Sequence, residues 1–327
     1  MNRFALDPSA HIDSADPARS RLHGLSTAPE SGQLPPEGRA GRAARYPVGL
    51  TFRTLASGAL DSLAAMTVPT GDGPALKRSL HWELRERLGT SGRKRARRAA
   101  DAMVAPFLGT WNASSATDSV ALTLDDGPDP EVTPALIDRL ADLDVHATFF
   151  ILTLRAEKYP QLVRRLVAHG HEVALHGLDH RRVTGLPGRE VQRYLADARS
   201  RLEQVTGRKV TMYRPPYGSQ SVISFLAARR AGLDVVAWNG HAADWVDRPA
   251  SEVTRAAVEA CKPGGIFLFH ERLEPDPGRD APVTTFDRVS VVSEIVEQVR
   301  QRSLSPCTVG EMTGRGSRML RTAWFRP

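Results

Sequence analysis

Cysteine is nearly absent from the sequence, which has only Cys261 and Cys307 among its 327 residues. Two cysteines can build neither a disulfide framework nor a zinc site of four thiolates. Neither has another cysteine or a histidine at ligand spacing, so we expect two inert thiols. The scarcity of cysteine fits a reducing compartment.

Long apolar runs are also missing. No stretch reaches the roughly 18 apolar residues expected of a membrane helix. The nearest candidate, residues 48–68, is interrupted by Arg53 and Asp61. Residues 1–50 lack the apolar core of about 7–15 residues that a signal peptide carries. These features predict a cytoplasmic protein without a membrane span.

Negative charge is outnumbered, with 44 Lys and Arg against 37 Asp and Glu, for a net charge of +7. Much of the excess lies in the run Arg93–Arg98, which reads R-K-R-A-R-R. Such a run can bind nucleic acid or another anionic surface. A solvated helix face or a flexible basic linker is the commoner role, so we do not expect nucleic acid as a partner. The composition indicates no particular oligomeric state.

The chain changes character along its length. Residues 1–70 are rich in Pro, Gly, Ser, Ala and Arg and have no hydrophobic period, which predicts a disordered leader. Residues 71–117 combine leucines spaced four apart with basic residues, which predicts a basic helical extension. Residues 118–312 form the expected main domain, and residues 313–327 read as a basic tail.

The main domain alternates strand patterns with helix patterns. Strands are expected at 120–124, 147–152, 172–175, 210–213, 235–238, 266–269 and, briefly, 308–309. Helices are expected at 133–143, 161–169, 190–205, 222–231, 253–261 and 289–299. Repeated β-α units predict a parallel sheet. Six or seven units within roughly 190 residues favour a compact, irregular barrel over an open sheet.

Two neighbouring acids, Asp125 and Asp126, end the first expected strand within the run T-L-D-D-G-P-D. On an extended strand their side chains point to opposite faces. Adjacent carboxylates resist joint ionisation unless a cation lies near them. Because ligands bind at the carboxyl ends of strands in α/β folds, one acid can bind a metal while the other acts as a base. The alternative is a plain strand-to-turn corner with a capping Asp.

Chemically active side chains follow the other strands as well. His176 and His180 are four residues apart, which places both imidazoles on one side of a helix or tight turn. Two histidines and one carboxylate make a metal triad with open positions. Arg214, in R-P-P-Y-G, can hold a carboxylate, and the N–H of Tyr217 can donate a hydrogen bond. Further along come the pairs Asp244-Trp245 and His270-Glu271.

Five short motifs follow one another along the chain: T-L-D-D-G-P-D, H-G-L-D-H, R-P-P-Y-G, D-W and L-F-H. In this order they resemble the motifs of the polysaccharide deacetylase family, the NodB-homology domain. The resemblance covers residues 119–312. It implies a distorted (β/α)₇ barrel, here with a partly disordered, partly helical N-terminal extension. It also implies a metal-dependent hydrolase that removes an N-acetyl group from an N-acetylated amino sugar or oligosaccharide. Hydrolysis of a small-molecule amide or an O-acetyl ester is the alternative.

The resemblance implies a role for each matching residue. Asp126, His176 and His180 would bind one divalent ion, with zinc as the first choice and cobalt or nickel as alternatives. Asp125 would be the general base, oriented and kept ionised by Arg214.

The same resemblance implies that His270 is the general acid and that Asp244 tunes it. The backbone N–H of Tyr217 would stabilise the oxyanion, and Trp245 and Leu268 would line the pocket for the acetyl methyl group. Three positions depart from the family pattern: Leu175 where many members have Asn, Gly177 where Ser or Thr is common, and His241 where many have Asp. Glycine at position 177 gives the loop between His176 and His180 less support than Ser or Thr would give. Together, the three departures leave the identity of the substrate open.

Two other classes of protein share parts of this pattern. A non-haem iron oxygenase uses the same triad of two histidines and a carboxylate, but it has no use for Asp125, Arg214 and His270. A binding protein on an inactive scaffold could use the basic run at 93–98, but the intact acids and histidines argue against it. Metal content and acetate release separate the three.

Overall fold

The computed structural model describes residue 105 and residues 108–275, 280–314 and 317–322. The chain divides into two units, 1–73 and 74–327, and every described residue belongs to the second. The expected leader, most of the helical extension and the basic run at 93–98 lie outside these residues. Within them, no helix has the length and apolar character needed to cross a membrane. The cytoplasmic location stays a prediction.

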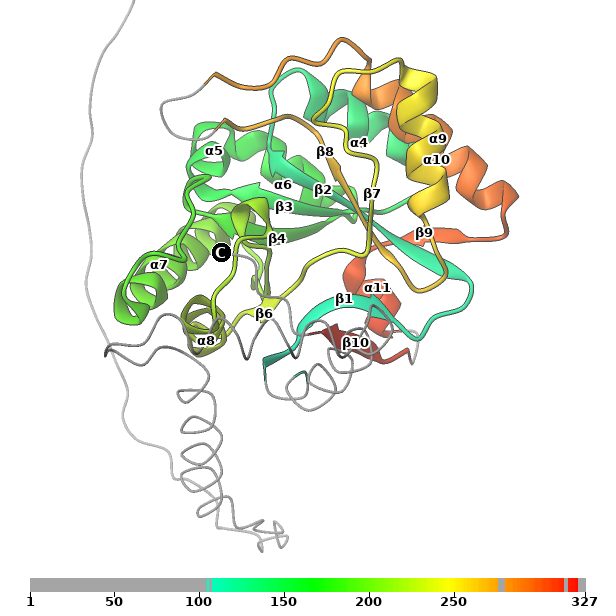
Figure 1. Cartoon of the computed structure of the whole chain (residues 1–327). Coiled ribbons are helices and arrows are strands. Elements are labelled where there is room, and N and C mark those ends of the chain that lie inside the picture. Colours follow the sequence, from blue (N-terminus) through cyan, green and yellow to red (C-terminus); the bar gives the residue numbers. More distant parts are fainter. Residues whose placement is uncertain (1–104, 106–107, 276–279, 315–316, 323–327) are drawn as a thin grey trace, which may run out of the picture. The chain divides into compact units, whose positions relative to one another are not determined.

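A curled parallel sheet forms the centre of the fold (Figure 1). Its order is β6 (Asp234–Val235), β5 (Met212–Tyr213), β4 (Glu172–Gly177), β3 (Thr148–Leu152), β2 (Ser119–Gly127), β8 (Ile266–His270) and β7 (Gly240–His241). A further strand, β9 (Ser305–Cys307), pairs in parallel with the start of β2. The predicted distorted (β/α)₇ barrel is therefore confirmed.

Helices pack on the outside of this sheet (Figure 1). They are α4 (Val132–Asp142), α5 (Thr153–Lys158), α6 (Pro160–Ala168), α7 (Gly188–Thr206), α8 (Val222–Arg230), α9 (Ala250–Ala260) and α10 (Arg288–Gln301). Each helix expected within residues 118–312 is present with slightly shifted ends, and α5 was not expected. The short 3₁₀ turn η1 (Pro216–Gly218) follows β5.

Side chains alternate along β2 as the two-residue period of a strand requires. Val120, Leu122 and Leu124 pack in the cluster that the outer helices cover, whereas Ala121 packs in a second cluster with Phe150 and other residues of neighbouring strands. The second cluster fills the inside of the curled sheet. The same alternation carries position 125 toward the inside at the carboxyl end of the strand.

The expected strand at 308–309 is wrong. The strand lies at Ser305–Cys307, and Val309 begins α11 (Val309–Gly314). Thr308 and Glu311 form a capping box, because the N–H of Glu311 donates to Thr308 Oγ1 and the N–H of Thr308 donates to Glu311 Oε2, each at 2.9 Å. This reciprocal cap starts a helix where a short final strand was expected.

A second, two-stranded sheet was not expected from the sequence. β1 (Thr110–Ser114) pairs antiparallel with β10 (Met319–Thr322), so part of the expected basic tail is a strand. Trp111 also forms a bridge with Val236, and Ala113 forms one with Gly265. β1 therefore links the residue after β6 to the residue before β8.

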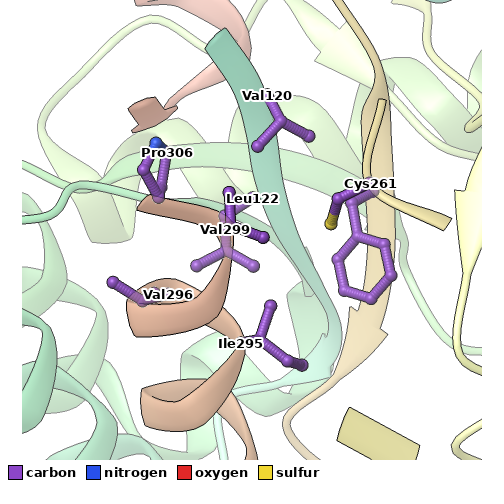
Figure 2. A pocket seen from close by; sticks show the side chains of 8 residues that line it. Val120, Leu122, Cys261, Ile295, Val296, Val299 and Pro306 are labelled. Atoms are coloured by element: carbon purple, nitrogen blue, oxygen red, sulfur yellow. The ribbon is translucent and has the colours of Figure 1, made fainter. Parts of the chain in front are cut away.

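A small gap lies between β2, β8 and α10 (Figure 2). It holds only about 10 Å³ and is lined by Val120, Leu122, Cys261, Phe267, Ile295, Val296, Val299 and Pro306. An apolar gap of that size is a dry packing defect, since it offers no polar partner to a water or ligand. Burial raises the pKa of the Cys261 thiol to about 12, in keeping with the expected inert thiols.

Candidate functional site

Strand β2 ends in a β-bulge that turns both acids toward one point. The register against β3 shifts between Asp125 and Gly127, and Asp126 takes the left-handed φ of 72°. Asp125 Oδ2 and Asp126 Oδ1 lie 3.9 and 3.2 Å from the same atom, His176 Nε2. The expectation that the two carboxylates face opposite sides is therefore wrong, because it assumed an unbroken strand.

Three side chains converge in the arrangement of a metal site. Asp126 Oδ1 lies 3.2 Å from His176 Nε2 and 3.4 Å from His180 Nε2. One ligand atom from each of the three residues lies within 4.8 Å of the others, and all three side chains are buried. Asp126 comes from β2, His176 from β4 and His180 from the loop after β4.

The hydrogen bonds around these side chains leave the right lone pairs for a cation. His176 Nδ1 lies 2.8 Å from the carbonyl oxygen of Arg214, which can only accept, so Nδ1 carries a proton, and in the neutral imidazole this leaves Nε2 as an acceptor. Asp126 Oδ2 accepts from the N–H of Glu274 at 2.8 Å. Asp126 Oδ1 is buried without a hydrogen-bond partner in the described part of the chain. Two acceptors that face each other in a buried site fit a shared cation, and one oxygen with two nitrogens suits zinc.

Charge states also fit metal binding. Burial alone would raise the pKa of Asp126, but the neighbouring His176, His180 and His270 reverse this and bring it to about 2. Burial lowers the pKa of His180 to about 4, only partly opposed by Asp126. At neutral pH the site therefore presents a carboxylate and a neutral imidazole, which are the forms that bind a metal.

The second acid, Asp125, is held by a buried arginine. Arg214 Nη1 donates to Asp125 Oδ1 at 2.6 Å and lies 2.8 Å from Thr123 Oγ1. The guanidinium carbon lies 3.9 Å from the centre of the Phe150 ring. These contacts fix one carboxylate oxygen and leave Oδ2 on the side of His176.

A second pair, His270 and Asp244, stands beside the acids. Asp125 and His270 are paired in register on β2 and β8. His270 Nδ1 lies 3.1 Å from Asp244 Oδ1, and the backbone N–H of His270 donates to Asp244 Oδ2 at 3.0 Å. Burial alone would lower the pKa of His270, but Asp244, Asp126 and Asp125 raise it to about 9. The imidazole is therefore protonated at neutral pH.

Aromatic and apolar side chains surround these groups. The Trp245 ring meets His270 edge-on at 5.8 Å between ring centres and lies against His241 at 5.1 Å. Leu268 is buried two residues before His270 on the same face of β8. The Tyr217 ring lies 4.2 Å from that of His180. These contacts bring the candidate metal ligands together with Asp125, Arg214, Asp244, Trp245 and His270, while the individual roles stay predictions.

Known proteins of similar sequence identify the family. Residues 112–236 match the polysaccharide deacetylase family. A chitooligosaccharide deacetylase of Sinorhizobium fredii is 34% identical over 186 residues, which cover 56% of this chain and 86% of that protein. The chain belongs to the polysaccharide deacetylase family.

Other members of the polysaccharide deacetylase family extend the match. A peptidoglycan-N-acetylglucosamine deacetylase of Bacillus cereus is 28% identical over 205 residues, covering 62% of this chain and 92% of that protein. A solved structure of a peptidoglycan N-acetylglucosamine deacetylase aligns with a TM-score of 0.55 at 26% identity, covering 63% of this chain and 93% of that one. The family match over residues 112–236 includes β2 to β6 and the candidate metal ligands Asp126, His176 and His180.

Arg288, on α10, is a residue of this site that the sequence did not reveal. Its Nη1 donates to Asp244 Oδ2 at 2.8 Å and to the carbonyl oxygen of His270 at 2.9 Å, and its Nη2 donates to the carbonyl oxygen of Asp244 at 3.2 Å. Arg288 thereby holds in place Asp244, the hydrogen-bond partner of His270. No motif surrounds Arg288, so the only signal was a charged residue on the buried face of a helix.

The sequence also did not reveal that Glu271, which follows His270, is a buried residue that packs beside the site. It is fully buried, accepts a hydrogen bond from the Thr133 hydroxyl, and lies against Gly127. Burial raises the pKa of Glu271 to about 8. A Cβ added to Gly127 would come 1.4 Å from Glu271 Oε1, so only glycine fits beside the two acids.

We expect Gly127→Ala to destabilise the protein by about 1–3 kcal/mol, because the new methyl group must displace a buried carboxyl. Gly185→Ala is the matched control, since a Cβ there meets nothing within 4 Å. Urea unfolding of both variants measures the difference. Equal stability of the two variants would contradict the packing of Glu271 on Gly127.

Proposed function

We propose that this protein is a metal-dependent hydrolase that removes the N-acetyl group from an N-acetylated amino sugar or oligosaccharide. The observation that carries the proposal is the convergence of Asp126, His176 and His180 directly beside Asp125 and His270. Membership of the family supports the substrate class, because its relatives are named as deacetylases of chitooligosaccharides and of peptidoglycan N-acetylglucosamine.

Each residue has a distinct task in this proposal. A divalent cation held by Asp126, His176 and His180, with zinc as the first choice, supplies a Lewis acid for the amide carbonyl and the attacking water. Asp125 accepts the proton of that water through Oδ2, since Arg214 already occupies Oδ1.

The leaving group needs a proton because an amine anion is a poor leaving group. His270 is protonated at neutral pH through its contact with Asp244, so it can donate that proton to the departing nitrogen. Asp125 thus acts as the base and His270 as the acid. The positive Arg214 beside Asp125 and the negative Asp244 beside His270 support this division.

We assign the binding of the acetyl group to the residues around His270. Leu268 and Trp245 offer apolar surface for the methyl group, and the backbone N–H of Tyr217 is the proposed donor to the oxyanion. Residues 118–312 form the proposed catalytic domain. β1 adds bridges to Val236 and Gly265, and β10 pairs with β1.

The proposal is tested by measuring acetate release from a panel of substrates. The panel contains chitooligosaccharides, peptidoglycan fragments, acetylated xylan and small N-acetyl compounds, each with protein loaded with one equivalent of zinc and with protein stripped by a chelator. We expect release from at least one N-acetylated sugar only when metal is present. Release that is unaffected by stripping, or none from any substrate with zinc-loaded protein, would overturn the proposal.

A further inference from the structure

The loop that joins His176 to His180 is held from outside by one side chain, Tyr194 of α7. The backbone N–H groups of Leu178 and Asp179 both donate to Tyr194 Oη, each at 3.1 Å. The same oxygen lies 2.8 Å from Asp179 Oδ1 and 3.1 Å from the carbonyl oxygen of Asp179. All four of these neighbouring atoms belong to two consecutive loop residues, Leu178 and Asp179.

These contacts use the full hydrogen-bonding capacity of the Tyr194 hydroxyl. A tyrosine hydroxyl accepts two hydrogen bonds and donates one. Tyr194 accepts from the two backbone N–H groups and donates to Asp179. Asp179 Oδ1 also accepts a hydrogen bond from Arg181 Nε at 2.8 Å, so both Tyr194 and Arg181 hold the Asp179 side chain.

Gly177, the first residue of the loop, has no room for a side chain that could stabilise the loop. Gly177 has a φ of 124°, and a Cβ there would lie 2.9 Å from the carbonyl oxygen of Asp179 and 3.3 Å from Tyr194 Oη. Position 177 therefore excludes any side chain that could hold the loop from within. The hydroxyl that satisfies the loop backbone comes instead from α7.

The two histidines are oriented to different degrees. His176 is fixed through its second nitrogen by the carbonyl oxygen of Arg214. His180 Nδ1 is buried and has no hydrogen-bond partner among the residues that the structure describes. Since a ligating histidine is usually oriented through its second nitrogen, His180 depends on its backbone and on the Tyr217 ring beside it.

We propose that Tyr194 is a positioning residue of the metal site: it sets the backbone that carries His180. This inference rests on the proposed function, because it assumes that Asp126, His176 and His180 hold a divalent cation. It adds a residue 14 positions beyond His180, whose hydroxyl hydrogen-bonds to Leu178 and Asp179 of the loop. Removal of its hydroxyl orphans two backbone donors on the residues between the histidines.

The test is Tyr194→Phe, which removes only the hydroxyl. We expect its dissociation constant for Zn²⁺, measured on the full chain by competition with a chromophoric chelator, to rise roughly 10–100-fold. Tyr213→Phe is the matched control. The Tyr213 hydroxyl is buried but has no hydrogen-bond partner in the described ranges, so its loss should leave zinc affinity unchanged.

The outcomes separate this inference from the proposed function. If the wild-type protein does not bind Zn²⁺, the proposed metal site is wrong and the inference is wrong with it. If the wild type and both variants bind Zn²⁺ equally well, the role of Tyr194 is refuted while the proposed function stands.

A second measurement needs no variant. In the metal-free wild-type protein, the amides of Leu178 and Asp179 should be protected from hydrogen exchange, because both donate to Tyr194. Exchange of these amides at the rate of an unstructured peptide would refute the inference even if Tyr194→Phe failed to fold.

Discussion

Asp125→Asn should retain bound zinc and lose catalytic rate, by roughly 10²–10⁴-fold if Asp125 is the proton acceptor. Asparagine keeps an oxygen that can accept from Arg214 Nη1, which lies 2.6 Å from Asp125 Oδ1 in the native site. The side chain therefore stays in place. It loses only its capacity to take a proton from the attacking water.

Asp126→Asn should fail differently. Asp126 Oδ1 is the buried oxygen that faces both His176 Nε2 and His180 Nε2, so loss of its charge removes a ligand. Zinc content should fall, and excess zinc should restore part of the rate. The β-bulge brings both acids to one site, so the contrast depends on their contacts and not on the strand face each occupies.

Elemental analysis for zinc, beside the rate of acetate release, measures both variants under one set of conditions. The assignment requires a metal-loaded, slow Asp125→Asn protein and a metal-poor Asp126→Asn protein. A metal-free Asp125→Asn protein, or one with full activity, would overturn the division into base and ligand.

The sequence predicted the site well where its residues follow strands. Asp125, His176 and His270 each end a run of apolar residues, and the carboxyl ends of parallel strands meet at one edge of a sheet. A strand-by-strand analysis therefore brings them together without any knowledge of long-range contacts. The barrel followed from the same alternation of strands and helices.

The residues that support the site from a distance were not predictable in this way. Arg288 and Tyr194 lie on outer helices, and each acts on the site through contacts with a loop that is remote in sequence. The bulge at Asp126 depends on a left-handed backbone that aspartate adopts only occasionally. The strands β1 and β10 are short, and their pairing joins opposite ends of the described chain.

Asp244→Asn should move the alkaline limb of the pH–rate profile to lower pH. In the native site Asp244 opposes the effect of burial and holds the pKa of His270 at about 9. A general acid is active below its pKa, so the native rate should persist through neutral pH and fall as pH rises toward that value. A bound cation offsets part of the charge of Asp126, which places the limb somewhat below 9.

Removal of the Asp244 charge leaves only Asp126 and Asp125 to oppose the effect of burial, so the pKa of His270 falls and the imidazole is neutral over more of the pH range. Asparagine still accepts a hydrogen bond from Arg288, which limits the structural damage. The matched comparison is His270→Ala, which should lower amide hydrolysis by roughly 10²–10⁴-fold and remove the alkaline limb. Activated acetyl esters should be affected far less by either variant, because their leaving groups need no proton. Equal losses for amides and activated esters, or an alkaline limb that stays in place in Asp244→Asn, would show that His270 is not the proton donor.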